Sequence, residues 1–190
     1  MGDAMLDFTL RDPATAVPPA APRIHLAAPA DVPFIVEAIA QESRAGHFSC
    51  DCDQPGALDG LWHQVHSVVA DGAMPLPGER HGAGGRAFVV QLRQVNAGFA
   101  ILVEHRPGSW LRRLELFALG VRPGFRGRGL ARQLVTSLVR ESRSASVYAR
   151  CAYASVGMVG LLKSCGFELG GESTAATMTL ELRRGWRPAE

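Results

Sequence analysis

A turn rich in arginine and glycine that runs directly into a helix constrains this sequence more than any other feature. Residues 117–139 read FALGVRPGFRGRGLARQLVTSLV. The stretch begins as an apolar strand, passes through Arg-Gly-Arg-Gly and continues from near Arg128 with the apolar spacing of an amphipathic helix. A helix entered directly from a strand places the turn at the carboxyl end of that strand, where α/β sheets bind ligands. The sequence therefore predicts a ligand site at this turn.

The residue types in the turn favour an anionic ligand. Gly127 and Gly129 lack a Cβ, so the backbone there can adopt unusual dihedral angles and approach a ligand closely. The first N–H groups of a helix have no partner within the helix and carry partial positive charge, which suits phosphate. Arg126 and Arg128 would add positive charge at the rim. We therefore expect a phosphate-bearing ligand.

Two common phosphate-binding motifs are excluded. A dinucleotide fingerprint needs glycine at the position of Arg132, and a Walker A loop needs Gly-Lys-Ser/Thr, which the turn lacks. The turn RGRGLA at 126–131 instead fits the pyrophosphate signature R/Q-x-x-G-x-G/A, and here the sequence resembles the GNAT superfamily of acyl-CoA-dependent N-acyltransferases. Two segments, LELFALGVRPGFRGRGLARQLV and CAYASVGMVGLLKSCGFE, resemble that family from its fourth strand to its third helix and from its fifth strand through its fourth helix.

The composition predicts a single domain and makes no case for a nucleic-acid or membrane protein. The chain of 190 residues is long enough to bury one substantial core, and its formal net charge of +2 gives no general attraction for nucleic acid or membranes. No basic stripe with stacking aromatic residues accompanies the turn, so RNA binding is the weaker interpretation. The absence of a signal-peptide pattern and of 18 consecutive apolar residues predicts a cytoplasmic location.

We expect a flexible Pro- and Ala-rich leader over residues 1–22 and a single N-acetyltransferase domain over residues 23–190. Within the domain, the hydrophobic periodicity predicts a strand, two helices, three antiparallel strands, a helix, a strand, a helix and a final strand. This order predicts an α/β (α+β) fold with a mixed, mostly antiparallel central sheet flanked by helices. The resemblance implies the same GNAT-like acyl-CoA N-acyltransferase fold.

Several local expectations accompany this order. Asp31 is predicted to cap the first helix, a turn around Asn96 to join two strands, and DGAMPLPGERHGAGGR at 71–86 to form a loop. The stripe of the second helix is predicted to contain Leu58, Leu61, Trp62, Val65 and Val69. The last strand is predicted to alternate, with Met178, Leu180 and Leu182 inward and Thr177, Thr179 and Glu181 outward.

The resemblance implies acetyl-CoA as co-substrate. Its pyrophosphate would lie on the backbone amides of the turn, and its pantetheine arm would pair like an extra strand with residues 118–121, where the fourth and fifth strands of the family separate. The cofactor-binding residues implied in this way are Ala118, Leu119, Val121, Arg126, Gly127, Arg128, Gly129, Leu130, Ala131 and Ser155.

Direct acyl transfer to a primary amine requires a neutral amine, and an amine with a pKa of about 10 is almost wholly protonated at neutral pH. A general base is therefore useful. Glu115 is the catalytic candidate, because it lies in an otherwise apolar strand and matches the position where some family members carry the base. Burial would bring its protonation into a useful range. An ion pair with Arg113 or Arg93 is an equally strong interpretation.

The sequence departs from the family at the general acid. The family often carries a tyrosine four residues before the Gly-Phe pair and an asparagine at the start of the same helix, and these positions are Leu162 and Ser155 here. Water, Ser155 or Tyr153 could protonate the leaving thiolate instead. Two functions stay open: an active N-acetyltransferase, which we favour, and a non-catalytic acyl-CoA-binding or regulatory module.

The remaining candidate features concern metals and the acceptor. His47, Cys50, Cys52 and Asp53 lie close together in sequence, but no second ligand pair accompanies them, so we expect ordinary loop cysteines and no metal. The acceptor would be a small-molecule or protein amine, with no nucleic-acid or membrane partner, and the resemblance leaves a homodimer open. Residues proposed to line the acceptor side are Glu42, Asp51, Asp53 and Trp62.

Overall fold

The computed structural model describes residues 21–48, 51–75, 83–105, 112–142, 145–171 and 173–183. Of the predicted leader, only the last two positions are among the described residues, and Cys50 lies outside them.

The described part of the chain forms a mixed sheet with the strand order β1-β3-β4-β5-β6-β8-β7, and β2 pairs with β3. Only β5 and β6 are parallel, so the predicted mixed and mostly antiparallel sheet is confirmed. The strands are β1 (Arg23–Leu26), β2 (Ala73–Met74), β3 (Ala83–Leu92), β4 (Val95–His105), β5 (Arg113–Val121), β6 (Ser146–Ala152), β7 (Phe167–Leu169) and β8 (Thr177–Leu182).

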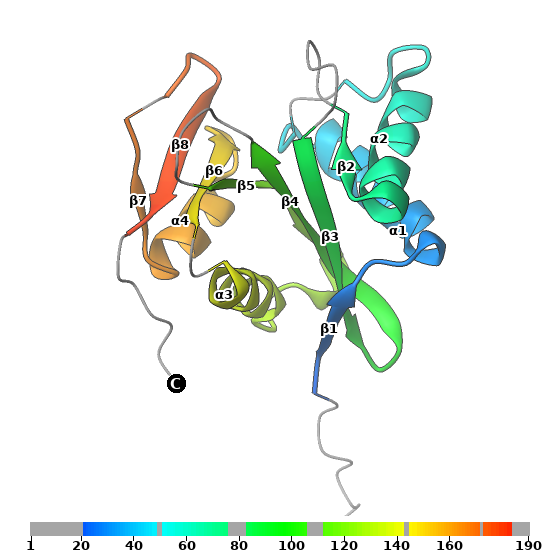
Figure 1. The fold of residues 1–190 in the computed structure, drawn as a ribbon, viewed down its shortest axis with the longest axis horizontal. Coiled ribbons are helices and arrows are strands. Elements are labelled where there is room, and N and C mark those ends of the chain that lie inside the picture. The colour runs from blue at the N-terminus through cyan, green and yellow to red at the C-terminus, as the bar shows by residue number, and fades with distance from the viewer. Residues whose placement is uncertain are drawn as a thin grey trace, which may run out of the picture.

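Helices lie on both faces of the sheet and enclose two apolar cores (Figure 1). The helices are α1 (Val32–Arg44), α2 (Ala57–Asp71), α3 (Leu130–Glu141) and α4 (Val156–Ser164), with short 3-10 turns η1 (Pro29–Asp31) and η2 (Pro123–Phe125). Helices α1 and α2 pack on the face of β3 and β4, and α3 packs on the opposite face. Among the described residues, no helix has both the length and the apolar character that crossing a membrane requires.

Strands β5 and β6 separate after a short stretch of pairing. Only Arg113–Glu115 pair with residues 146–148 of β6, although β5 continues to Val121. The register between β4 and β5 also shifts, because Ile101 lies opposite Ala118 and Leu102 lies opposite Leu116. Phe117 is therefore the extra residue of a β-bulge, which bends the strand. Among the described strands, the second half of β5 thus has a neighbour on one edge only.

Two predicted local features near the amino end of α1 are corrected. Helix α1 does begin after Asp31, but the Asp31 carboxylate accepts hydrogen bonds from the Ala28 backbone N–H at 2.9 Å and from Asn96 Nδ2 at 2.7 Å rather than capping the helix. The turn predicted around Asn96 lies earlier, at Arg93 and Gln94, whose φ angles are 51° and 64°. Asn96 lies within β4, and its side chain donates a hydrogen bond to Asp31 instead of forming part of the turn.

Three further expectations need correction. In α2 the buried residues are Val65 and Val68, whereas Leu58 and Trp62 are exposed. The predicted loop at 71–86 contains β2 and the start of β3. Thr179, predicted to face outward, is 4% exposed, because it lies opposite Arg150 within the sheet.

Gly120 fixes the approach of β4 to β5 beside the separated strands. A Cβ at Gly120 would lie 2.5 Å from Phe99 Cε1, and Phe99 is fully buried with its ring packed edge-on to Phe34 at 6.3 Å between centroids. The Phe99 ring therefore occupies the space above the glycine, and it cannot move away without disturbing α1.

We predict that Gly120→Ala lowers the free energy of unfolding by about 1–3 kcal/mol, because the methyl group overpacks against a rigid ring. Urea unfolding measures the change. Gly160→Ala is the matched control: its Cβ would meet nothing within 4 Å in helix α4, so this change should be neutral or stabilise by up to about 1 kcal/mol. Equal destabilisation by both variants would contradict the packing described here.

Candidate active site

A cavity of about 500 Å³ lies where β5 and β6 separate. Its walls come from the second half of β5, the turn before α3, both faces of β6, helix α4 and the segment that follows α1. Ala149 and Arg150, which are adjacent in β6 and point to opposite faces of the sheet, both line it. This is the lining expected of a gap between strands rather than of a pocket on one face.

The structure places the residues predicted to bind the cofactor along this cavity, with the exception of Arg128. The lining includes Ala118, Leu119, Val121, Arg126, Gly127, Gly129, Leu130, Ala131 and Ser155. The guanidinium carbon of Arg128 instead lies 5.6 Å from the centre of the Phe125 ring. The cofactor-binding roles of all these residues stay a prediction.

The turn has the geometry that its glycines suggested. Gly127 and Gly129 have φ angles of 74° and 75°, in the left-handed region that favours glycine. Gly129 is the residue before α3, and a Cβ on either glycine would meet nothing within 4 Å. Because none of the described side chains caps the amino end of α3, the turn offers an open, positively polarised surface that fits a pyrophosphate.

Arg126 holds this turn in place. Its Nε donates to the Val121 carbonyl at 2.9 Å, and its Nη2 bonds to Glu42 of α1. Glu42 lines the cavity as proposed for the acceptor side, but its carboxylate is engaged by Arg126. The end of β5, the turn and α1 are therefore tied together by one guanidinium group.

Glu115 is buried at the point where β5 and β6 separate, with its side chain 3% exposed. Arg150 Nε and Nη2 donate to its two carboxylate oxygens at 2.7 and 2.9 Å. His105 Nε2 lies 2.7 Å from Oε2, and the Tyr148 hydroxyl donates to the same oxygen at 3.2 Å. The ion pair of Glu115 is therefore formed with Arg150 and not with Arg113 or Arg93, the partners considered from the sequence. Arg113 pairs with Glu181 at 3.1 Å instead.

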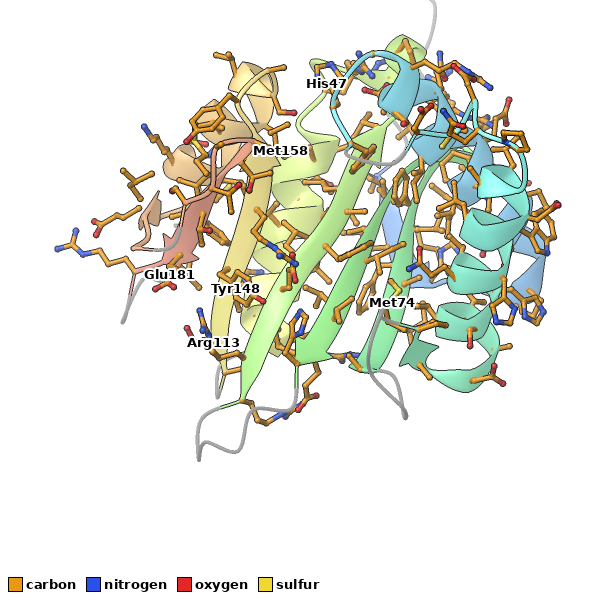
Figure 2. The ribbon with its side chains drawn as sticks, turned by 90° about the horizontal axis from the view of Figure 1, so that it is seen from above. His47, Met74, Arg113, Tyr148, Met158 and Glu181 are labelled. Carbon is orange, nitrogen blue, oxygen red and sulfur yellow. The ribbon has the colours of Figure 1, made fainter. Side chains whose placement is uncertain are left out.

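These groups belong to a polar surface that we call the polar shelf, formed by His105, Arg113, Glu115, Tyr148, Arg150 and Glu181. Figure 2 shows its labelled members, Arg113, Tyr148 and Glu181, on the part of the sheet beside α1 and α2 that those helices leave uncovered. The pKa of Tyr148 is raised to about 12, mainly by burial and secondly by the nearby negative charge of Glu115. The Tyr148 hydroxyl therefore stays protonated and acts as a donor at neutral pH.

The segment after α1 closes one end of the cavity against α4. His47 Nδ1 lies 3.3 Å from Ser155 Oγ, and both residues line the cavity. Figure 2 shows His47 and Met158 of α4 at the same end of the sheet. Of the two hydroxyls considered as replacements for the missing tyrosine, only Ser155 lies here. The Tyr153 hydroxyl donates to the Thr174 carbonyl at 3.2 Å, away from the cavity.

Leu162 and Cys151 give the cavity an apolar wall. Leu162, at the position of the family's tyrosine, is fully buried and lines the cavity, so no side-chain donor is available there. Cys151 also lines the cavity, and burial raises the pKa of its thiol to about 11. At neutral pH this side chain is a thiol and a poor nucleophile.

The other residues proposed for the acceptor side do not line the cavity. Asp53 pairs with Arg44 at 3.1 Å, Asp51 accepts from Gln54 Nε2 at 3.0 Å, and Trp62 lies on the exposed face of α2. Within the described ranges, no three His, Cys, Asp or Glu side chains are grouped so that they could hold a metal.

Sequence reasoning missed Arg150 and Tyr148, and it considered His47 only as a metal ligand. A signal for the first two was present, because the strand SVYARCA places Tyr148 and Arg150 on one face while Val147, Ala149 and Cys151 fill the other. A tyrosine and an arginine on one face of an interior strand indicate a polar site. His47 carried no comparable signal, since it follows α1 in an irregular segment.

The fold and the cavity together define a class of acyl-CoA-dependent transferase, and the comparisons with known proteins agree. Residues 55–167 match the model of the acetyltransferase (GNAT) family. The chain belongs to this family. No curated protein matches the chain significantly.

Solved structures share the fold at low sequence identity. An acetyltransferase of the GNAT family from Streptococcus agalactiae matches with a TM-score of 0.64 and 18% identity, covering 87% of this chain and 96% of that one. The PaiA N-acetyltransferase from Thermoplasma acidophilum, in complex with coenzyme A, matches with a TM-score of 0.60 and 14% identity. The match covers 86% of this chain and 99% of that one. A spermidine N-acetyltransferase from Vibrio cholerae, in complex with CoA and spermine, matches with a TM-score of 0.60 and 17% identity. The match covers 84% of this chain and 92% of that one.

We predict that the alkylation rate of Cys151 by iodoacetamide rises about tenfold per pH unit between pH 7 and 10 without a plateau, because its pKa of about 11 keeps the thiolate scarce throughout. Peptide mass spectrometry follows the reaction. A free cysteine peptide, with a pKa of about 8.5, should level off within the same range. A plateau for Cys151 below pH 9 would show that the thiol ionises readily.

Proposed function

We propose that this GNAT-family acetyltransferase transfers an acetyl group from acetyl-CoA to a primary amine by direct attack. One observation carries the proposal: the gap between β5 and β6 runs from the open glycine turn at Gly127 and Gly129 to Arg150, the member of the polar shelf that lines the cavity. The co-substrate supplies the activated thioester, and the chain's own residues bind it, orient the amine and move protons.

The cavity suits the two parts of the co-substrate. The open turn at Gly127 and Gly129 would hold the pyrophosphate. The edge of Ala118–Val121, which has no strand neighbour on the β6 side, would pair with the amide groups of the pantetheine arm. Ser155, at the amino end of α4, would contact the same arm from the opposite wall.

Direct attack fits the character of Cys151. A route through an acetylated enzyme needs a nucleophilic side chain, and this cavity-lining cysteine is a buried thiol with a raised pKa. The attacking amine must instead lose its proton before reaction. Glu115 is the proposed proton acceptor. It reaches the cavity through Arg150, so the proton would pass by way of a water molecule or the Tyr148 and His105 groups that contact it.

The proton for the leaving thiolate has a second proposed source. Ser155 is a hydroxyl on the cavity wall, and His47 lies within hydrogen-bond distance of it. We propose that this pair donates the proton that the tyrosine donates elsewhere in the family. Figure 2 shows His47 well apart from Tyr148, which contacts Glu115, so the groups that remove and return protons belong to different parts of the site.

We predict that Gly129→Glu abolishes measurable coenzyme A binding in calorimetric titration. The side chain would force a left-handed backbone onto a residue that disfavours it and would place a negative charge where phosphate must lie. Gly124→Glu is the control, because Gly124 lies in the adjacent η2 turn, has open space around it and lacks a positive φ. Its affinity should fall by roughly threefold or less, since salt screens the added charge. Normal binding by Gly129→Glu would remove the turn from the site.

We predict that Glu115→Gln lowers kcat by about 100-fold, the usual contribution of a general base. The loss should be largest at the lower end of the pH range, where the amine is most protonated. Release of coenzyme A thiol over a panel of primary amines measures it. Glu168→Gln, an exposed carboxylate in β7, is the control and should leave kcat unchanged. A variant with a raised acceptor KM and an unaltered pH profile would show that Glu115 only positions Arg150.

A further inference from the structure

Arg150 lines the cavity and has a hydrogen-bonding edge that its ion pair with Glu115 does not use. Its Nε and Nη2 bind the Glu115 carboxylate side-on. A guanidinium group has five N–H donors in a planar fork, so Nη1 and the outer N–H of Nη2 form a second edge. Among the described residues, no group accepts a hydrogen bond from Nη1. The side chain is 50% exposed while Glu115 is buried, so the free edge is the exposed one.

The position of this edge matches that of an acceptor. Tyr148 is the last residue of β6 that pairs with β5, and Arg150 follows two residues later. At a strand rise of roughly 3.3 Å per residue, Arg150 lies roughly 7 Å beyond the point where the strands separate. It therefore lines the mouth of the gap, between the polar shelf and the apolar wall of the cavity.

The charges around Arg150 favour an anion on the incoming molecule. Glu115 lies beneath Arg150, and the exposed carboxylate nearby, Glu181, is paired with Arg113. Arg113 also covers the Tyr148 ring, with its guanidinium carbon 4.8 Å from the ring centre. Because Glu115 is buried and Glu181 is held by Arg113, the charged group of the shelf that is left to meet an incoming molecule is the outer edge of Arg150. A planar carboxylate matches a guanidinium edge with two parallel hydrogen bonds, whereas a polyamine would meet like charge.

We propose that Arg150 selects the acceptor by binding a carboxylate that the acceptor carries in addition to its amine. This proposal rests on the proposed transfer of an acetyl group to an amine and narrows its substrate class to amino acids and related amino carboxylates. In addition to its proposed role as proton acceptor, Glu115 holds Arg150 in the required orientation. The guanidinium charge would also disfavour the protonated form of a nearby amine and so favour the form that attacks.

The first test uses wild-type protein and matched acceptors. Glycine, β-alanine, 4-aminobutyrate and the standard α-amino acids are each paired with the corresponding amine or amide that lacks the carboxylate, and spermine is added as a polyamine. We expect the best substrate to be a carboxylate member whose kcat/KM exceeds that of its partner about 10- to 100-fold, the range for a charge-assisted hydrogen-bonded pair. Equal or better use of the partner or of spermine would overturn the proposal and leave the acetyltransferase function intact.

The second test uses variants. Arg150→Gln should lower kcat/KM for the carboxylate member about 10- to 100-fold and leave that for its partner within about threefold, so that the preference disappears. Arg150→Lys keeps the positive charge but lacks the planar fork of the guanidinium group. Its preference for the carboxylate member should therefore lie between those of the wild type and Arg150→Gln. Arg183→Gln removes a similar exposed arginine at the far edge of the sheet and should change neither value. An unchanged preference in a folded Arg150→Gln protein would overturn the proposal.

A binding measurement separates this proposal from the transfer reaction. If no amine is acetylated, the proposed function fails, but the role of Arg150 can still be decided. The measurement is calorimetric titration of the amino carboxylates, and of their partners without the carboxylate, into protein saturated with coenzyme A. Binding of a carboxylate member that is lost in Arg150→Gln would support the proposal. Equal binding of both members, or binding of neither, would overturn it.

Discussion

The early end of pairing between β5 and β6 is the constraint on which the rest of the site depends. Parallel pairing stops at Glu115 and Tyr148, and the bulge at Phe117 bends β5 in the same region. Without this separation the strands would bond along their length and no cavity would exist. Because they separate, backbone groups of β5 face a gap that leads from the glycine turn to the polar shelf.

The ion pair of Glu115 with Arg150 stabilises this separation. A carboxylate buried in a sheet is costly unless its oxygens are bonded, and here Arg150, His105 and Tyr148 supply the partners. The bonds connect β4, β5 and β6 just where the backbone pairing ends. One group thus compensates for lost backbone contacts and orients the guanidinium that faces the cavity, which links the stability of the sheet to the chemistry of its open end.

The sequence predicted features that depend on neighbouring residues and missed those that depend on register. The turn at Gly127 and Gly129 was predictable, because left-handed backbone and a helix start follow from local residue types. The pairing of Glu115 with Arg150 was not, because 35 residues separate them and the short parallel register that joins them has no local signature. The hairpin between β3 and β4 was predicted, but its turn was expected around Asn96 instead of Arg93 and Gln94, because neither of these residues is typical of a turn with positive φ.

Hydrogen exchange with and without coenzyme A tests most directly whether the gap between β5 and β6 holds the co-substrate. We predict that coenzyme A protects the amides of the turn at 127–131 and also those in the second half of β5, and that the nucleotide half of coenzyme A, lacking the pantetheine arm, protects the turn alone. Binding that protects neither segment, or that protects β5 equally without the pantetheine arm, would contradict the assignment of this gap as the binding site.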